Sequence, residues 1–295
     1  MFKNCTIYRI EFTEPTILSE IDFLPFEPCG PMQERSVGWT PPRSEAHGAL
    51  IEFVNSQAIM ELTIETKTVP AQAIDKRLDE LVDSIEKTTG RKPGKKERRN
   101  LIDDIRLELL PAAFPKRSTV GVWIDRAAGL LTIGTATQSK ADLVLTELVN
   151  SMPGLQVALL QTTTSPAGFM TNLLADEHRQ GPDFFVGAEC ELAASDETKA
   201  KIRFTNCDLE TQEVRDHILH GKRPTKLALS WRGRVSFVLT DSGTLRKLKF
   251  MDVVFESGKA REAGFDADVA IATGELVPLI GCLIAALGGE PEGDK

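Results

Sequence analysis

The sequence predicts an α+β fold built mainly from antiparallel β-sheets, with flanking helices and a projecting helical hairpin. Segments in which apolar and polar residues alternate, as is typical of strands, occur along much of the chain. Segments with apolar residues at helical spacing are interspersed among them, and a strand hairpin followed by a helix occurs twice. This mixed order differs from the regular strand–helix alternation of a parallel sheet, and therefore indicates the α+β class.

The first expected strand covers residues 4–11. Residues 25–48 are rich in Pro and Gly, so we expect mostly loop and turn there. Two β-like segments follow at 49–54 and 58–67, and the second shows clear alternation. The chain thus begins with strands joined by a long loop.

A helical hairpin is expected next. Apolar residues fall at helical spacing from 71 to 86 and again from 95 to 110, where Pro111 ends the pattern. The turn between them, residues 88–94, is basic. Two amphipathic helices with a short turn form an αα-hairpin, which we expect to project from a β-rich body.

The same two periodicities predict the remaining elements. They are hairpin strands at about 119–124 and 129–135, a helix at 139–152, a strand at 155–160, a short helix at 165–175, short strands within 183–207, a helix at 211–220, strands at 225–231, 234–240 and 245–250, a strand near 265–273 and a helix from 274 to about 287. The apolar stretch 276–287 contains Pro278 and Gly281 and is expected to be too short to cross a bilayer. Five scattered cysteines without a CxxC pair indicate reduced thiols in a cytoplasmic protein.

The formal net charge of −8 argues against a nucleic-acid partner, because phosphate binding depends on Lys and Arg. The charge is unevenly distributed, however. Residues 87–99 contain seven basic residues and one acidic residue, and residues 215–249 contain nine and two. Residues 176–213 contain ten acidic and four basic residues. The basic stretches are either solvated faces that keep the protein soluble or surfaces that contact phosphates.

Two observations favour phosphate contact. Arg232 and Arg234 lie on a predicted strand adjacent to the one that carries Arg246, Lys247 and Lys249, and alternation places i and i+2 on one face. The turn of the helical hairpin also presents cations at a tip. Without an aromatic ladder or a recognition helix, sequence-independent contact with duplex phosphates remains. The candidate DNA-binding residues are Lys92, Lys95, Lys96, Arg98, Arg99, Arg223, Lys226, Arg232, Arg234, Arg246, Lys247 and Lys249.

An alternative is a metal-dependent nuclease. Asp183, Glu197 and Lys199 mimic the PD…ExK spacing in which two carboxylates hold a divalent ion. The second carboxylate lies in a polar segment that is more typical of a turn than of a buried strand. His217 and His220 are spaced for a shared metal, but capping of a helix end explains them better. We therefore expect no catalysis, no cofactor and no metal.

Short segments along the whole chain, in register, resemble the RdgC family. They are Phe2-Lys3-Asn4, Ile7-Tyr8-Arg9, Pro28-Cys29-Gly30, Gly38-Trp39, Pro41-Pro42, Leu109-Leu110-Pro111, Ala113-Phe114, Trp123-Ile124-Asp125, Thr225-Lys226-Leu227-Ala228-Leu229, Trp231, Leu245-Arg246-Lys247-Leu248-Lys249-Phe250, Phe265-Asp266-Ala267-Asp268 and Thr273-Gly274-Glu275-Leu276. The resemblance implies a non-enzymatic, nucleoid-associated protein that forms a ring-shaped, head-to-head homodimer. Such a ring encircles double-stranded DNA with little sequence preference and restrains RecA by competing for DNA.

The resemblance also implies regional roles. Residues 1–70, 117–160 and 223–295 would form a β-rich centre, residues 71–116 a helical tip, and residues 161–222 a base. Phe114 would reach into the partner subunit at the tip, although an ordinary core position is an equal alternative.

Two segments depart from the family pattern. Residues 11–27 are shorter and interrupted by proline, and Asn206-Cys207 stands where relatives carry a Lys-Gln-like pair. Any contact implied for that pair is therefore in doubt.

Overall fold

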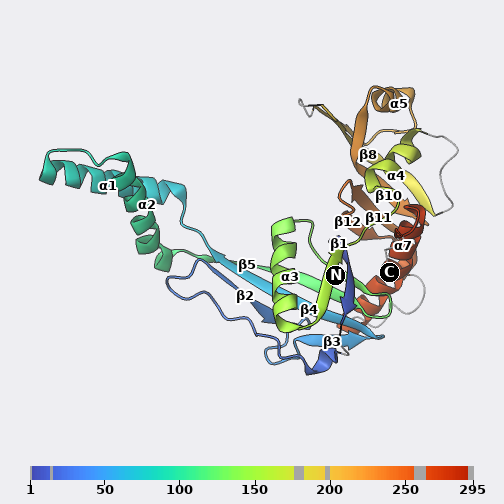
Figure 1. The fold of residues 1–295 in the computed structure, drawn as a ribbon, viewed down its shortest axis with the longest axis horizontal. Helices are drawn as coiled ribbons and strands as arrows, with labels where there is room; N and C mark the ends of the chain where they lie inside the picture. The colour runs from blue at the N-terminus through green and yellow to red at the C-terminus, as the bar shows by residue number, and fades with distance from the viewer. Residues whose placement is uncertain (1, 14–15, 176–182, 197–199, 256–263, 292–295) are drawn as a thin grey trace. The chain divides into compact units, whose positions relative to one another are not determined.

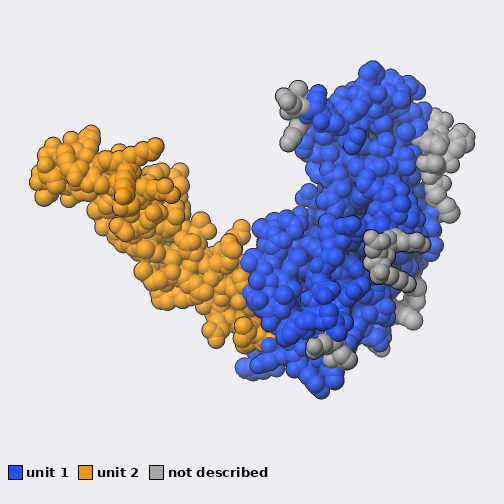
Figure 2. All heavy atoms as spheres, in the orientation of Figure 1, with its two compact units in different colours: residues 1–22, 41–60, 121–295 blue, residues 23–40, 61–120 orange. Residues whose placement is uncertain are grey.

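The computed structural model describes residues 2–13, 16–175, 183–196, 200–255 and 264–291 (Figure 1). They form two compact units, coloured separately in Figure 2. Unit 1 comprises 1–22, 41–60 and 121–295, and unit 2 comprises 23–40 and 61–120. The elements in chain order are β1 (Asn4–Phe12), η1 (Leu18–Glu20), β2 (Arg35–Thr40), β3 (Ile51–Val54), β4 (Gln57–Lys67), α1 (Ala71–Thr89), α2 (Lys95–Leu109), η2 (Leu110–Ala112), β5 (Pro115–Asp125), β6 (Leu130–Ile133), α3 (Gln138–Ser151), β7 (Leu155–Leu159), α4 (Pro166–Ala175), β8 (Phe184–Ala194), β9 (Lys201–Thr205), α5 (Gln212–Leu219), β10 (Lys222–Trp231), β11 (Val235–Thr240), β12 (Leu245–Phe250), α6 (Asp252–Phe255) and α7 (Phe265–Ala286).

The predicted α+β class with mainly antiparallel sheets is confirmed. In unit 1 the strand order runs β6-β1-β12-β11-β10-β8-β9, and β7 also pairs with β1. Strand β1 is shared: Asn4 and Cys5 pair with β12, whereas Thr6–Arg9 pair with β6. A single N-terminal strand therefore joins two parts of the sheet whose sequences lie more than a hundred residues apart.

Helices cover one face of the β8–β11 sheet. Figure 1 shows α4 and α7 beside β10 and β11, and contacts join α4 to both strands and to α5. The core they enclose includes Met170 of α4, Leu227 of β10 and Leu276 of α7, all fully buried. The opposite face of these strands is thereby left for charged side chains.

The predicted strand near 265–273 is wrong, because α7 is one helix from Phe265 to Ala286. Its first residues read as alternating, but Val269, Ala272, Leu276, Leu279 and Leu283 form one buried helical face. The apolar stretch 276–287, expected to be too short to cross a bilayer, forms the second half of this longer helix. The whole helix is long and apolar enough to span one by length and composition, yet its buried face packs into the unit 1 core.

Residues 25–48 are mostly loop and turn, as expected, but they also contain β2, which pairs with β4 over six residues in unit 2. Trp39 of β2 is 1% exposed and packs edge-on against Phe23, with ring centroids 5.5 Å apart. Gly38 is needed there, because a Cβ atom would lie 2.5 Å from the Phe26 Cα. Packing thus makes Arg35–Thr40 a strand inside a segment whose composition favours turns.

The helical hairpin of unit 2 is confirmed as α1 and α2, within three residues of the predicted bounds. Its small core consists of Ile74, Leu78 and Val82 from α1 and Ile105 from α2. Gly90 ends α1 in the left-handed conformation (φ 73°), which glycine adopts without steric strain. The basic turn is therefore fixed between two packed helices.

Candidate nucleic-acid interface

The cations of the hairpin lie at the start of α2. Lys95, Lys96, Arg98 and Arg99 are exposed, and among the described residues none of them forms an ion pair. Lys92 lies 3.6 Å from the Glu86 carboxylate. Basic side chains at a helix N-terminus add to the positive end of the helix dipole, so this end of α2 attracts anions.

Glu97 is the single acidic residue in the basic stretch 87–99. Both oxygens of its carboxylate accept hydrogen bonds from the Arg91 guanidinium at 2.8 Å, and Oε2 also accepts one from the Gly94 amide at 2.8 Å. These bonds hold the pKa of Glu97 at about 2. Glu97 fixes the turn and neutralises Arg91, while Lys95, Lys96, Arg98 and Arg99 stay outside any ion pair among the described residues.

Arg232 and Arg234 do not share a strand face with the β12 cations, so that prediction is wrong. Both lie in the β10–β11 turn, where Arg232 has a positive φ of 48°. Arg232 Nε donates to Asp183 (2.6 Å), and the Arg234 guanidinium bonds the Glu275 carboxylate of α7. These two candidates are therefore engaged in ion pairs within unit 1.

The sheet brings Lys226 to a buried carboxylate that the sequence did not single out. Glu191 of β8 is 5% exposed and lies opposite Lys226 of β10 and Arg203 of β9. Its Oε2 accepts hydrogen bonds from Lys226 Nζ at 3.0 Å and Arg203 Nη2 at 2.8 Å. Lys201 Nζ (3.3 Å) and the Thr225 hydroxyl (3.0 Å) donate to Oε1. Arg203 contributes most to lowering the pKa of Glu191 to about 2, so the carboxylate stays ionised.

Beside Glu191 lies a cleft of about 180 Å³. Its charged lining residues are Glu189, Glu191, Arg203, Lys226, Arg246 and Lys247. Lys247 Nζ donates to both oxygens of Glu189, at 2.6 and 2.8 Å. Four cations thus face two carboxylates, and the cleft carries a net positive charge. We name it the β8–β12 cleft.

The remaining candidates of the second basic stretch are Arg223, Arg246 and Lys249. All three are exposed, and in the described part of the chain none forms an ion pair. Lys201 and Arg203 were missed because they lie in the acidic stretch 176–213. The spacing Glu189-x-Glu191 followed by Lys201-x-Arg203 was the available signal, since i and i+2 share a strand face.

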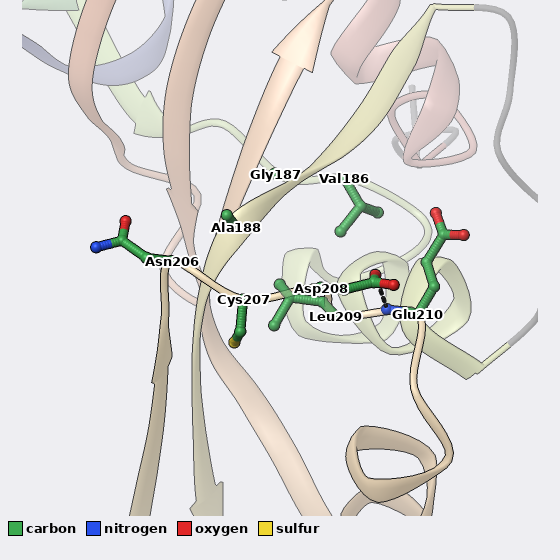
Figure 3. Close-up of a pocket in the computed structure, with 8 residues that line it drawn as sticks. All are labelled: Val186, Gly187, Ala188, Asn206, Cys207, Asp208, Leu209 and Glu210. Carbon is green, nitrogen blue, oxygen red and sulfur yellow. Dashed lines mark hydrogen bonds between the residues drawn. The ribbon is translucent and has the colours of Figure 1, made fainter.

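A second cleft, of about 470 Å³, has a different character. It is lined by Val186, Gly187, Ala188, Asn206, Cys207, Asp208, Leu209 and Glu210 (Figure 3). Asp208 accepts a hydrogen bond from the Glu210 amide at 2.9 Å, and the Asn206 side chain points away from Val186 and Glu210 (Figure 3). With two acids and no cation among its lining residues, it suits an anion poorly.

The nuclease residues are not brought together within the described residues. Asp183 pairs with Arg232, while Glu197 and Lys199 lie outside the described residues. The described ranges contain no group of three His, Cys, Asp or Glu side chains placed to hold a metal. The His220 Nδ1 donates to the Asp216 carbonyl oxygen (2.6 Å), as the capping interpretation predicts.

Phe114 is 92% exposed, which excludes the alternative of an ordinary core phenylalanine. It lies four residues after the buried Leu110 of η2 and directly precedes β5. A large aromatic ring held in solvent is unfavourable in an isolated subunit, and such side chains are typical of contact surfaces.

Comparison with known proteins covers nearly the whole chain. A family model described as "Putative exonuclease, RdgC" matches residues 1–290. The recombination-associated protein RdgC of Janthinobacterium sp. (strain Marseille) is 35% identical over 300 residues, covering 99% of both chains. That of Herminiimonas arsenicoxydans is 36% identical over 300 residues, covering 98% of both. The protein of the same name from Actinobacillus succinogenes is 35% identical, again over 98% of both.

Proposed function

This chain belongs to the RdgC family, and from that premise we propose that it binds double-stranded DNA without reading its sequence, as a homodimeric ring that encircles the duplex. We further propose that it acts in recombination by modulating RecA through competition for DNA, without catalysis of its own. The relatives named above are described as recombination-associated, which supports a role of this chain in recombination.

The observation that carries DNA binding is a set of exposed, uncompensated cations on a chain of net charge −8. Lys95, Lys96, Arg98 and Arg99 in unit 2, and Arg223, Arg246 and Lys249 in unit 1, are free of ion pairs within the described part of the chain. Such residues bind phosphates, which are the same at every base pair. Binding that depends on them varies little with sequence.

The homodimer is supported by the exposed ring of Phe114. A closed ring of two identical subunits needs two separate contacts about one two-fold axis. One contact between the two subunits where the helical hairpin ends, and a second contact elsewhere on each subunit, would close such a ring. Phe114 supplies an apolar anchor for the first of them.

Salt dependence tests DNA binding. We expect affinity for a duplex to fall by about 10³- to 10⁵-fold between 50 and 200 mM salt if 6 to 10 phosphates are contacted, and to be similar for unrelated sequences. Lys95→Glu and Lys96→Glu should each weaken binding uniformly across sequences. Arg35→Glu, at an exposed position outside both basic stretches, is the matched control. Affinity that does not change with salt contradicts the proposal.

Topology tests the ring. Protein loaded on circular plasmid at low salt should resist a high-salt wash and should be released when a restriction enzyme linearises the plasmid. Equal release from circular and linear plasmid would exclude encirclement while leaving DNA binding intact.

The absence of catalysis is tested separately, because the matching family model is described as "Putative exonuclease, RdgC". End-labelled linear duplex, incubated with excess protein and Mg²⁺ or Mn²⁺, should stay intact. Shortening that Asp183→Asn abolishes would instead establish the nuclease alternative.

A further inference from the structure

The β8–β12 cleft contains a local distortion that presents two cations on one side of a strand. Successive side chains of a regular strand point to opposite faces. Arg246 and Lys247 are successive, yet both line the cleft. The pairing of β11 with β12 shifts register between Ser236–Lys249 and Val238–Arg246, so β12 contains one extra residue there.

The extra residue is held in an unfavourable conformation by the N-terminal strand. Lys247 has φ of 53°, in the left-handed region that residues with a Cβ atom rarely adopt. Its amide donates to the Asn4 side chain (3.2 Å), and the Leu248 amide donates to the Lys3 carbonyl oxygen (2.9 Å). Strain of this kind persists where surrounding contacts fix it, and it clusters at functional sites.

The two carboxylates of the cleft are held differently. Glu191 is 5% exposed and accepts hydrogen bonds from three cations and a threonine, so it is part of the fixed wall. Glu189 is 35% exposed and contacts Lys247 alone among the cations of the described residues. Lys247 itself is 66% exposed. An exposed ion pair contributes little stability, so another anion can replace Glu189 at low cost.

We propose that the β8–β12 cleft is a subsite for one phosphodiester of the DNA backbone, and that Glu189 is a resident counter-ion which the phosphate displaces from Lys247. The phosphate oxygens then accept hydrogen bonds from Arg246 and Lys247. Lys226 and Arg203 stay bound to Glu191 and form the rest of the cationic lining of the cleft. The cleft volume of about 180 Å³ equals that of several water molecules, because one water occupies about 30 Å³ in the liquid, and this is enough space for a phosphate group. This inference rests on the proposed DNA binding and assigns one of its contacts.

The central experiment removes the counter-ion. Fluorescence anisotropy of a labelled duplex is compared for wild type, Glu189→Gln and Glu213→Gln at several salt concentrations. Glu213 is an exposed acid of α5 outside the cleft, so its substitution reproduces the change in net charge. Displacement predicts that Glu189→Gln tightens binding about 3- to 10-fold, whereas Glu213→Gln changes it less than 2-fold. Equal gains in the two variants would overturn the inference.

Lys247→Gly separates the subsite from the stability of the fold. Glycine accepts the left-handed conformation at this position and removes the cation, so we expect unchanged or raised thermal stability together with weaker DNA binding. In the double variant Glu189→Gln/Lys247→Gly, the gain from Glu189→Gln should be lost, since the residue that Glu189 neutralises is gone. A gain that persists in the double variant contradicts displacement.

The source of the phosphate is settled by competition. Inorganic phosphate and chloride, added at matched ionic strength, are compared as competitors of the duplex. If the cleft is a DNA subsite, inorganic phosphate and chloride should inhibit duplex binding to a similar extent, because the phosphodiester in the cleft is only one of many contacts between protein and DNA. Saturable binding of inorganic phosphate that Lys247→Gly abolishes, with duplex affinity unaffected, would assign the cleft to free phosphate and overturn the inference. If wild type does not bind duplex at all, the proposed function fails; if it binds but Glu189→Gln has no effect, only the subsite fails.

Discussion

The Arg91 guanidinium donates two hydrogen bonds of 2.8 Å to the Glu97 carboxylate across the turn between α1 and α2. This pair lowers the pKa of Glu97 from 4.5 to about 2. A group whose pKa is lower in the folded protein contributes stability above its unfolded pKa and loses it as the pH falls through the folded value. The contribution is therefore complete above about pH 4.5 and disappears towards pH 2.

Glu97→Gln tests this pair without removing the cap, because the glutamine oxygen still accepts the Gly94 hydrogen bond. We expect the variant to be less stable than wild type in urea unfolding at neutral pH, with the difference narrowing as the pH is lowered through 4.5 towards 2. A difference that stays constant over this range would show that the charge of Glu97 is not what stabilises the turn.

Neighbouring residues of α7 should respond very differently to truncation. Leu276 is fully buried, whereas Val277 is 36% exposed. Leu276→Ala should lower the free energy of unfolding by about 2–5 kcal/mol, and Val277→Ala by less than about 1 kcal/mol. Denaturant unfolding measures both. Similar losses at the two positions would contradict the helical arrangement of this segment.

The buried thiols should resist alkylation in the folded protein. Burial raises the pKa of Cys190 to about 12 and also raises that of Cys5, so neither forms the reactive thiolate at neutral pH. Iodoacetamide followed by mass spectrometry should label the partly exposed Cys29, Cys207 and Cys282 in the native protein, and should label Cys5 and Cys190 only after denaturation. Fast native labelling of Cys190 would indicate that the β8–β9 pair opens readily.

Phe114→Ala should affect association rather than folding. Because the ring is 92% exposed, its loss should change the free energy of unfolding of a subunit by no more than about 0.5 kcal/mol. As an anchor of a contact it should weaken self-association about 10-fold or more, as measured by analytical ultracentrifugation. Phe53→Ala, at a half-exposed aromatic of β3 in unit 1, is the control. An unchanged dissociation constant would remove Phe114 from the interface.

Local patterns predicted most of the fold, because most of its strands and the two helices of the hairpin have strong periodicities. Failures occurred where distant packing overrides composition. The segment containing Trp39 reads as a turn region, but its pairing with β4 makes it a strand. The start of α7 alternates like a strand, yet its buried face is helical once the unit 1 core is assembled.

The candidate site was predictable only in part, for the same reason. Runs of basic residues correctly indicated the exposed cations of α2 and β12. The Glu191 cluster depends on three strands lying side by side, and the bulge at Lys247 depends on Asn4, 243 residues away. The bulge at Lys247 has no local signal, and the Glu191 cluster has only the i, i+2 spacings within β8 and β9. Arg232 and Arg234 were misplaced because the turn between β10 and β11 is longer than predicted.

The double pairing of β1 has a consequence for synthesis. Its partners β6, β7 and β12 are translated about 120, 150 and 240 residues later, so β1 leaves the ribosome long before its edges can be covered. An unpaired strand rich in apolar residues is a template for aggregation. The first strand of the nascent chain therefore stays only partly paired until β12 has emerged from the ribosome.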